Sequence, residues 1–116
     1  MLFWYKIADH AHQLPWQPNG LCSVTVLGKP RIIARIANTC KAFAAGCPHA
    51  GAPLIEGTVN ARGEVVCPLH HYRFRIENGY NSSGEGYRLK TYLVEEREDG
   101  VYLGLSRSEE HTSELQ

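Results

Sequence analysis

The chain has 116 residues, in which 12 lysine and arginine side chains balance 12 aspartate and glutamate side chains, and 43% of residues are hydrophobic. This length favours a single domain with one small core and excludes a large enzyme with a separate substrate domain. The balanced charge argues against a nucleic-acid-binding protein, and the hydrophobic content argues against a disordered chain. No apolar run approaches the roughly 18 residues that a membrane helix needs.

The first residues, MLFWYKIADH, lack the basic start and the long apolar stretch of a signal peptide. We therefore expect a cytoplasmic protein without a membrane or nucleic-acid partner. In that compartment the four cysteines are best interpreted as metal ligands or free thiols.

Short apolar runs bounded by turn residues predict β-strands along most of the chain. We expect strands at residues 3–7, 21–27, 31–36, 42–45, 72–76, 89–94 and 101–105. Gly28-Lys29-Pro30 and Asp99-Gly100 are the predicted turns of two hairpins. This pattern is typical of an all-β fold whose antiparallel sheets form a sandwich or a barrel.

Two of the cysteines lie within this strand pattern. Cys22 falls in a predicted strand, where we expect it to be a small buried hydrophobic residue. Cys40 falls in a predicted turn at residues 38–41, where we expect an exposed free thiol.

The other two cysteines belong to the clusters Cys47-Pro48-His49 and Cys67-Pro68-Leu69-His70, which each offer one thiolate and one imidazole. Two thiolates and two imidazoles suit zinc or an iron–sulfur cluster. A catalytic Cys–His pair explains the pattern less well, because it gives no reason for a second copy. The short spacings, with Cys and His mixed in both halves, differ from the usual pattern of a zinc finger.

The pattern C-x-H followed by C-x2-H resembles that of the Rieske [2Fe–2S] family. The resemblance includes CPHAGAPLIEG at residues 47–57 and CPLHHYRF at residues 67–74, and it begins with WYKIAD at residues 4–9. It implies a Rieske fold over residues 1–106, with a small lobe at about residues 45–75 in which two loops hold a [2Fe–2S] cluster. It also implies that Cys47 and Cys67 bind one iron of the cluster, while His49 and His70 bind the other.

Two features depart from the family pattern. His71 follows the last implied ligand, where the family commonly has glycine. We expect an exposed side chain there; the alternatives are a contact to a redox partner and a proton-sensitive influence on His70. The segment RSEEHTSELQ at residues 107–116 resembles the translation of a widely used sequencing adapter, so we exclude it from the fold as non-native.

The resemblance implies a soluble one-electron carrier that passes electrons from a flavin reductase to a terminal oxygenase or a related redox enzyme. The chain is too short for the mononuclear iron domain of an oxygenase subunit, so we expect an electron-transfer component rather than a catalytic one. One alternative is the Rieske small subunit of a nitrite-reductase-like enzyme. The other alternative is a zinc-stabilised structural module.

Overall fold

The structure is a computed structural model that describes residues 1–107, so nearly all of the predicted foreign segment 107–116 lies outside the described residues. The elements are β1 (Leu2–Ala8), η1 (Ala11–Gln13), β2 (Leu21–Val26), β3 (Lys29–Ile36), β4 (Thr39–Ala44), η2 (Leu54–Glu56), β5 (Thr58–Val59), β6 (Glu64–Val66), β7 (Arg73–Arg75), β8 (Thr91–Arg97) and β9 (Gly100–Ser106). No helical segment within residues 1–107 is long and apolar enough to cross a membrane.

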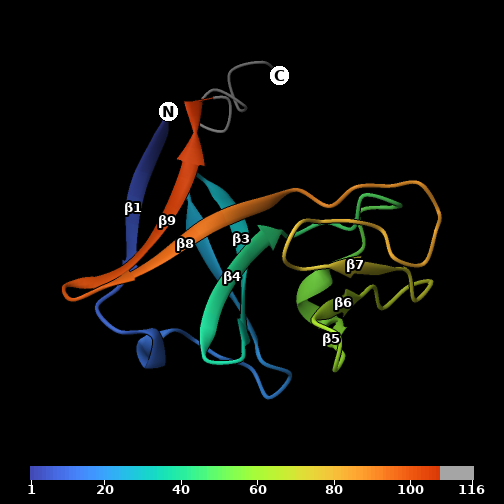
Figure 1. The fold of residues 1–116 in the computed structure, drawn as a ribbon, viewed down its shortest axis with the longest axis horizontal. Coiled ribbons are helices and arrows are strands. Elements are labelled where there is room, and N and C mark those ends of the chain that lie inside the picture. Colours follow the sequence, from blue (N-terminus) through green and yellow to red (C-terminus); the bar gives the residue numbers. More distant parts are fainter. Residues whose placement is uncertain (108–116) are drawn as a thin grey trace.

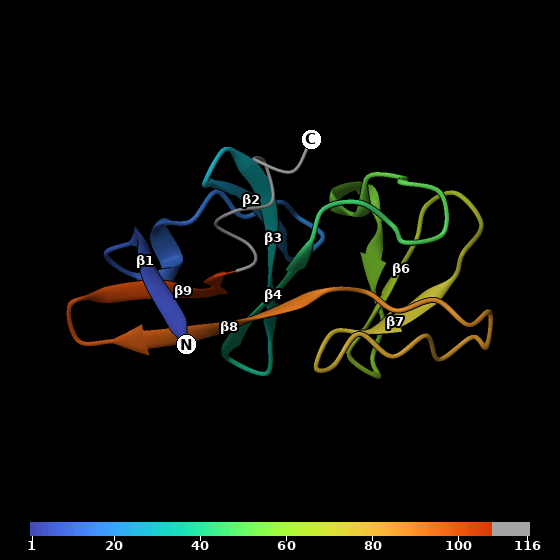
Figure 2. The same ribbon diagram turned by 90° about the horizontal axis from the view of Figure 1, so that it is seen from above.

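The strands form two antiparallel sheets, as the sequence predicted. The larger sheet has six strands in the order β1-β9-β8-β4-β3-β2, and the smaller sheet has three in the order β5-β6-β7. Figures 1 and 2 show the larger sheet curled at one end of the molecule and the smaller sheet at the other end. The predicted all-β fold class is therefore confirmed.

Two of the predicted turns, at 28–30 and 38–41, begin one residue earlier in the structure and are shorter. In the first, Val26 pairs with Lys29 across a two-residue turn at Leu27 and Gly28, whose φ angles are 55° and 75°. In the second, a two-residue turn at Ala37 and Asn38, with φ angles of 49° and 67°, precedes Thr39, which begins β4. Two consecutive positive φ angles match the right-handed twist of the strands that they join.

Because the turn before β4 covers residues 37 and 38 rather than 38–41, Cys40 lies in a different environment from the one predicted. The thiol was expected to be exposed in a turn, but Cys40 lies within β4 and is only 5% exposed. Burial raises its pKa to about 11, and burial raises the pKa of Cys22, which is buried as predicted, to about 12. Both thiols are therefore protonated at neutral pH and are poor nucleophiles.

The centre of β3 is buried on both of its faces, which explains its uninterrupted apolar run. Ile32 belongs to a core that extends into the smaller sheet and includes Phe74. Ile33, the next residue, points to the opposite face and packs in a second core with Leu103. The central strands of the larger sheet thus separate two cores, and one of these cores supports the smaller sheet.

Residues 45–90, a longer stretch than the lobe predicted at about 45–75, form the lobe that carries the smaller sheet, between two strands that pair with each other. Phe43 of β4 pairs with Thr91 of β8, and the Ala44 N–H donates to the Lys90 carbonyl at 2.9 Å. The lobe is also tied to the N-terminal part of the chain, because the Asn19 amide donates to the carbonyl oxygens of Ile55 and Gly57.

Candidate metal centre

The two Cys–His clusters lie in loops that have the same pattern of backbone hydrogen bonds. In the first loop the Cys47 N–H donates to Ala52 O at 2.9 Å, and the Gly51 N–H donates to Cys47 O at 2.7 Å. In the second loop the Cys67 N–H donates to Tyr72 O at 2.9 Å, and the His71 N–H donates to Cys67 O at 3.0 Å. These hydrogen bonds fix the backbone immediately after each cysteine.

The loops face each other and bring the four predicted site residues together as two pairs. The Nδ1 atoms of His49 and His70 are 3.3 Å apart, and their ring centroids are 4.7 Å apart. The buried thiols of Cys47 and Cys67 are neighbours, since Cys67 contributes to raising the pKa of Cys47. Among residues 1–107, no three His, Cys, Asp or Glu side chains gather around one point as the ligands of a single ion would.

The thiols are buried while the imidazoles reach toward solvent. Cys47 and Cys67 are 2% and 0% exposed, His49 is half-buried and His70 is exposed. Burial, the largest cause, and the neighbouring Cys67 raise the pKa of Cys47, whereas the backbone N–H groups of His49 and Ala50 lower it. These N–H groups would stabilise a thiolate that is bound to a metal.

Two tyrosines lie against His49. The His49 ring centroid lies 4.4 Å from that of Tyr72 and 5.6 Å from that of Tyr87. Tyr72 lies two residues after the second cluster, but no sequence pattern pointed to Tyr87. Its segment reaches the site only through tertiary folding.

The surface beside the imidazoles is largely apolar. A shallow groove of about 350 Å³ is lined by Ala52, Pro53, Glu56, Pro68 and Leu69. Leu69 is 52% exposed and lies together with Ala52, Pro53 and Pro68, so the apolar surface here is contiguous. The arrangement therefore places an accessible apolar patch next to the two histidines.

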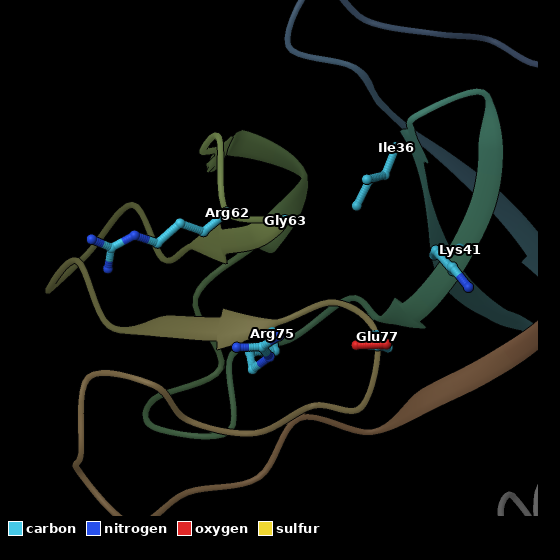
Figure 3. Close-up of a pocket in the computed structure, with 6 residues that line it drawn as sticks. All are labelled: Ile36, Lys41, Arg62, Gly63, Arg75 and Glu77. Atoms are coloured by element: carbon cyan, nitrogen blue, oxygen red, sulfur yellow. The ribbon is translucent and has the colours of Figure 1, made fainter.

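A second hollow, of about 200 Å³, lies where the lobe meets the β3–β4 hairpin (Figure 3). Its lining residues are Ile36, Lys41, Arg62, Gly63, Arg75 and Glu77. The long Arg62 side chain extends away from Ile36 and Glu77, so the hollow is less basic than its composition suggests. Neither Cys–His cluster contributes to it.

His71 has an exposed side chain, as the sequence predicted, but its backbone is left-handed, with φ at 62°. Gly51 holds the matching position of the first loop with φ at 72°. A left-handed conformation costs a non-glycine residue about 1–2 kcal/mol, which explains why glycine suits this position.

We expect His71→Gly to stabilise the protein by about 1 kcal/mol, because it removes most of this strain and the more flexible unfolded chain offsets only part of the gain. Urea unfolding of the metal-loaded protein measures the change. Gly51→Ala is the matched control: a Cβ there would meet no atom within 4 Å, so a loss of about 1 kcal/mol reflects backbone strain alone. A loss of stability in His71→Gly would instead mean that the imidazole makes a necessary contact.

Comparisons with known proteins identify a family. The family model of the Rieske [2Fe–2S] domain matches residues 3–92. The oxygenase subunit of carnitine monooxygenase from Acinetobacter baumannii is 32% identical over 75 residues, which are 64% of this chain and 20% of the relative. The chain therefore spans about a fifth of the length of that relative.

Two solved structures share the fold over most of their length. A chain in the complex of reduced oxygenase and oxidized ferredoxin of carbazole 1,9a-dioxygenase has a TM-score of 0.72 and 27% identity, with 86% of this chain and 91% of that chain covered. A putative NADH-dependent nitrite reductase small subunit from Mycobacterium tuberculosis has a TM-score of 0.77 and 18% identity, with 91% and 97% covered.

The chain belongs to the Rieske [2Fe–2S] domain family, and its cofactor is a [2Fe–2S] cluster of the Rieske type. Two thiols and two imidazoles are the donor set that distinguishes this centre from a cluster with four thiolates. Their pairwise convergence at the tip of the lobe fits that cofactor.

Proposed function

We propose that the chain carries single electrons on a [2Fe–2S] cluster held by Cys47 and Cys67 on one iron and by His49 and His70 on the other. The observation that carries the proposal is the convergence of the thiol pair and the imidazole pair from two loops with the same hydrogen-bond pattern. When bound, the cluster supplies one-electron exchange at a potential above that of plant-type ferredoxins. We also propose that residues 1–106 are one Rieske domain and that residues 107–116 are not native.

The chemistry of these ligands suits an electron carrier. Two ferric ions, two sulfides and two thiolates sum to zero charge, so neutral imidazoles leave the oxidised centre uncharged. Two further thiolates would add two negative charges and oppose the uptake of an electron. The exposed edge of His70 and the half-buried His49 lie at the surface, where a short path to a partner is available.

The proposed partners are a flavin reductase as electron donor and a terminal oxygenase or a related redox enzyme as acceptor. The likeness to a chain from a complex of oxygenase and ferredoxin supports this proposal. The likeness to a nitrite reductase small subunit, at 18% identity, concerns the fold alone. The free cysteines among residues 1–107 support a reducing compartment, and we propose the cytoplasm.

Purified protein tests the proposal directly. We expect iron and sulfide in equal amounts, visible absorption that bleaches on uptake of one electron per chain, and a rhombic electron paramagnetic resonance signal in the reduced state. A colourless protein that contains zinc would refute electron transfer. Stoichiometric co-purification with a large catalytic subunit would favour a dedicated enzyme component over a free carrier.

The apolar groove beside the imidazoles is the proposed docking surface. Weak redox encounters bury less than about 1,200 Å² in total, so one charge at the centre has a large influence. We expect Leu69→Glu to slow electron transfer to the partner by about tenfold or more, because docking would bury an unpaired carboxylate. Stopped-flow kinetics of the reduced protein with the partner measures the rate.

Leu93→Glu is the matched control, because Leu93 is 60% exposed but lies on β8 in the larger sheet. Both variants should keep the absorption spectrum of the parent protein. Equal rates for Leu69→Glu and the parent protein would place the docking surface elsewhere.

A further inference from the structure

A third segment, at residues 78–90, lies beside the two loops at the metal centre. It leaves β7, folds back across the smaller sheet and then enters β8 (Figures 1 and 2). Two of its glycines, Gly84 and Gly86, have φ angles of 88° and 87°. Tyr87, which follows them, is the residue of this segment that contacts His49.

The side chain of Asn81 holds this segment in place. Asn81 is only 4% exposed, and its Nδ2 atom, with two N–H groups, lies 3.0 Å from Arg73 O, 3.1 Å from Ser83 Oγ and 2.9 Å from Glu85 Oε1. Its Oδ1 atom accepts the Tyr87 N–H at 3.2 Å. One buried amide thus ties β7 to the backbone of Tyr87.

A second set of hydrogen bonds supports the same connection. The Arg73 N–H donates to Ser83 Oγ at 2.9 Å, and the Ser82 N–H donates to Arg73 O at 3.0 Å. The Ser83 hydroxyl in turn donates to the Glu85 carboxylate. The segment is therefore fixed by polar contacts to β7, with Asn81 as their buried centre.

The result of this anchoring is a contact between rings. Tyr87 meets His49 nearly edge-on, with an interplanar angle of 67°, and stacks on Tyr72 at 6.0 Å with an angle of 28°. Tyr72 contacts the same imidazole at 4.4 Å. His49 therefore has aromatic neighbours from two segments, whereas His70 is exposed and reaches Tyr72 only at 6.1 Å.

We propose that Tyr87 is a positioning residue for the metal centre: anchored through Asn81, its ring fixes the orientation of the His49 imidazole and keeps water from that side. The inference rests on the proposed function, because it takes His49 as an iron ligand. The groups around a ligating imidazole set its orientation, and solvent access influences the potential of the centre. The two imidazoles are consequently unequal: one is held by aromatic rings and the other is open to partners.

The test compares Tyr87→Ala with Tyr87→Phe in the cluster-loaded protein. Tyr87→Ala should keep full cluster content, change the histidine nitrogen hyperfine couplings of the reduced protein and raise the midpoint potential. The potential rises because water that reaches His49 stabilises the negative charge added on reduction. Tyr87→Phe keeps the ring and should restore the parent couplings and potential.

Two further variants complete the experiment. Asn81→Ala should shift the couplings and the potential in the same direction as Tyr87→Ala, since it releases the backbone that carries the ring. Tyr80→Ala should leave both readouts unchanged, because Tyr80 is 58% exposed on the same segment and makes none of the ring contacts to the histidines found within residues 1–107.

Parent-like couplings and potential in Tyr87→Ala would overturn the inference, and they would leave the assignment of the cluster ligands intact. Full cluster content in His49→Ala would overturn the ligand assignment itself, and the inference with it. If Asn81→Ala does not fold, Tyr87→Ala alone decides, because it removes only a partly exposed ring.

Discussion

Replacing either His49 or His70 by alanine is expected to lower cluster content by about tenfold or more. Each substitution leaves an iron with one protein ligand in place of two, and the remaining imidazole, 3.3 Å away, already serves the same iron in the proposed arrangement. Because cluster binding and folding of the lobe are coupled, the thermal midpoint should fall as well. Iron and sulfide analysis, visible absorption and a melting curve measure these changes.

His12 provides a control that removes the same side chain without touching the site. It is exposed and stacks on His10 near the N-terminus, with ring centroids 5.3 Å apart. His12→Ala should have the cluster content and the thermal midpoint of the parent protein. Normal loading of His49→Ala or His70→Ala would exclude that histidine as a ligand.

The second large effect is expected from Gly79→Ala, which should destabilise the protein by more than about 3 kcal/mol. A Cβ at Gly79 would lie 1.9 Å from the Leu89 carbonyl oxygen, and the φ angle of 80° adds strain for any other residue. The backbone cannot move aside without loss, because the Gly79 N–H donates to Arg75 O and Gly79 O accepts the Leu89 N–H. Both ends of the segment that carries Tyr87 depend on these contacts.

Gly28→Ala separates the steric clash from the backbone strain. Gly28 also has a positive φ, of 75°, but a Cβ there would meet no atom within 4 Å. We expect a loss of about 1 kcal/mol from backbone strain alone. Urea unfolding of both loaded variants gives the comparison, and equal losses would mean that the close approach to Leu89 is unimportant.

The strands of the larger sheet were largely predictable because their apolar runs, although short, are bounded by turn residues. The errors came from turns in which ordinary residues take unusual conformations. Leu27 and Ala37 have φ angles of 55° and 49°, and neither residue type favours such angles. At the first turn, glycine and proline shifted the prediction to residues 28–30. At the second, the turn was expected at residues 38–41, so the predicted start of β4 was too late and Cys40 was assigned to a turn. The strands β5 and β6, with two and three residues, are too short to show any period.

The predicted residues of the candidate site came from local spacing. Cys47, His49, Cys67 and His70 stand out because each Cys–His pair lies within four residues of chain, and the structure brings the two imidazoles together and the two thiols together. The neighbours of the site were not predictable in this way. Tyr87 reaches His49 only because Asn81 is buried against β7, and a contact between such distant positions leaves no periodic signal. Sequence spacing thus identified the proposed ligands, while the packing around them required the structure.

The pairing of β4 with β8 has a consequence for protein engineering. The lobe of residues 45–90 begins and ends at adjacent backbone positions, since Ala44 and Lys90 share a hydrogen bond of 2.9 Å. Chain termini that lie this close are a condition under which an inserted domain is tolerated. The larger sheet continues through that pair as an ordinary antiparallel ladder, so a two-residue turn in place of the lobe would close β4 and β8 into a plain hairpin. The Rieske lobe is therefore an insert whose ends fit a hairpin, but it shares a core with β3, so an acceptor sheet must also offer it an apolar face.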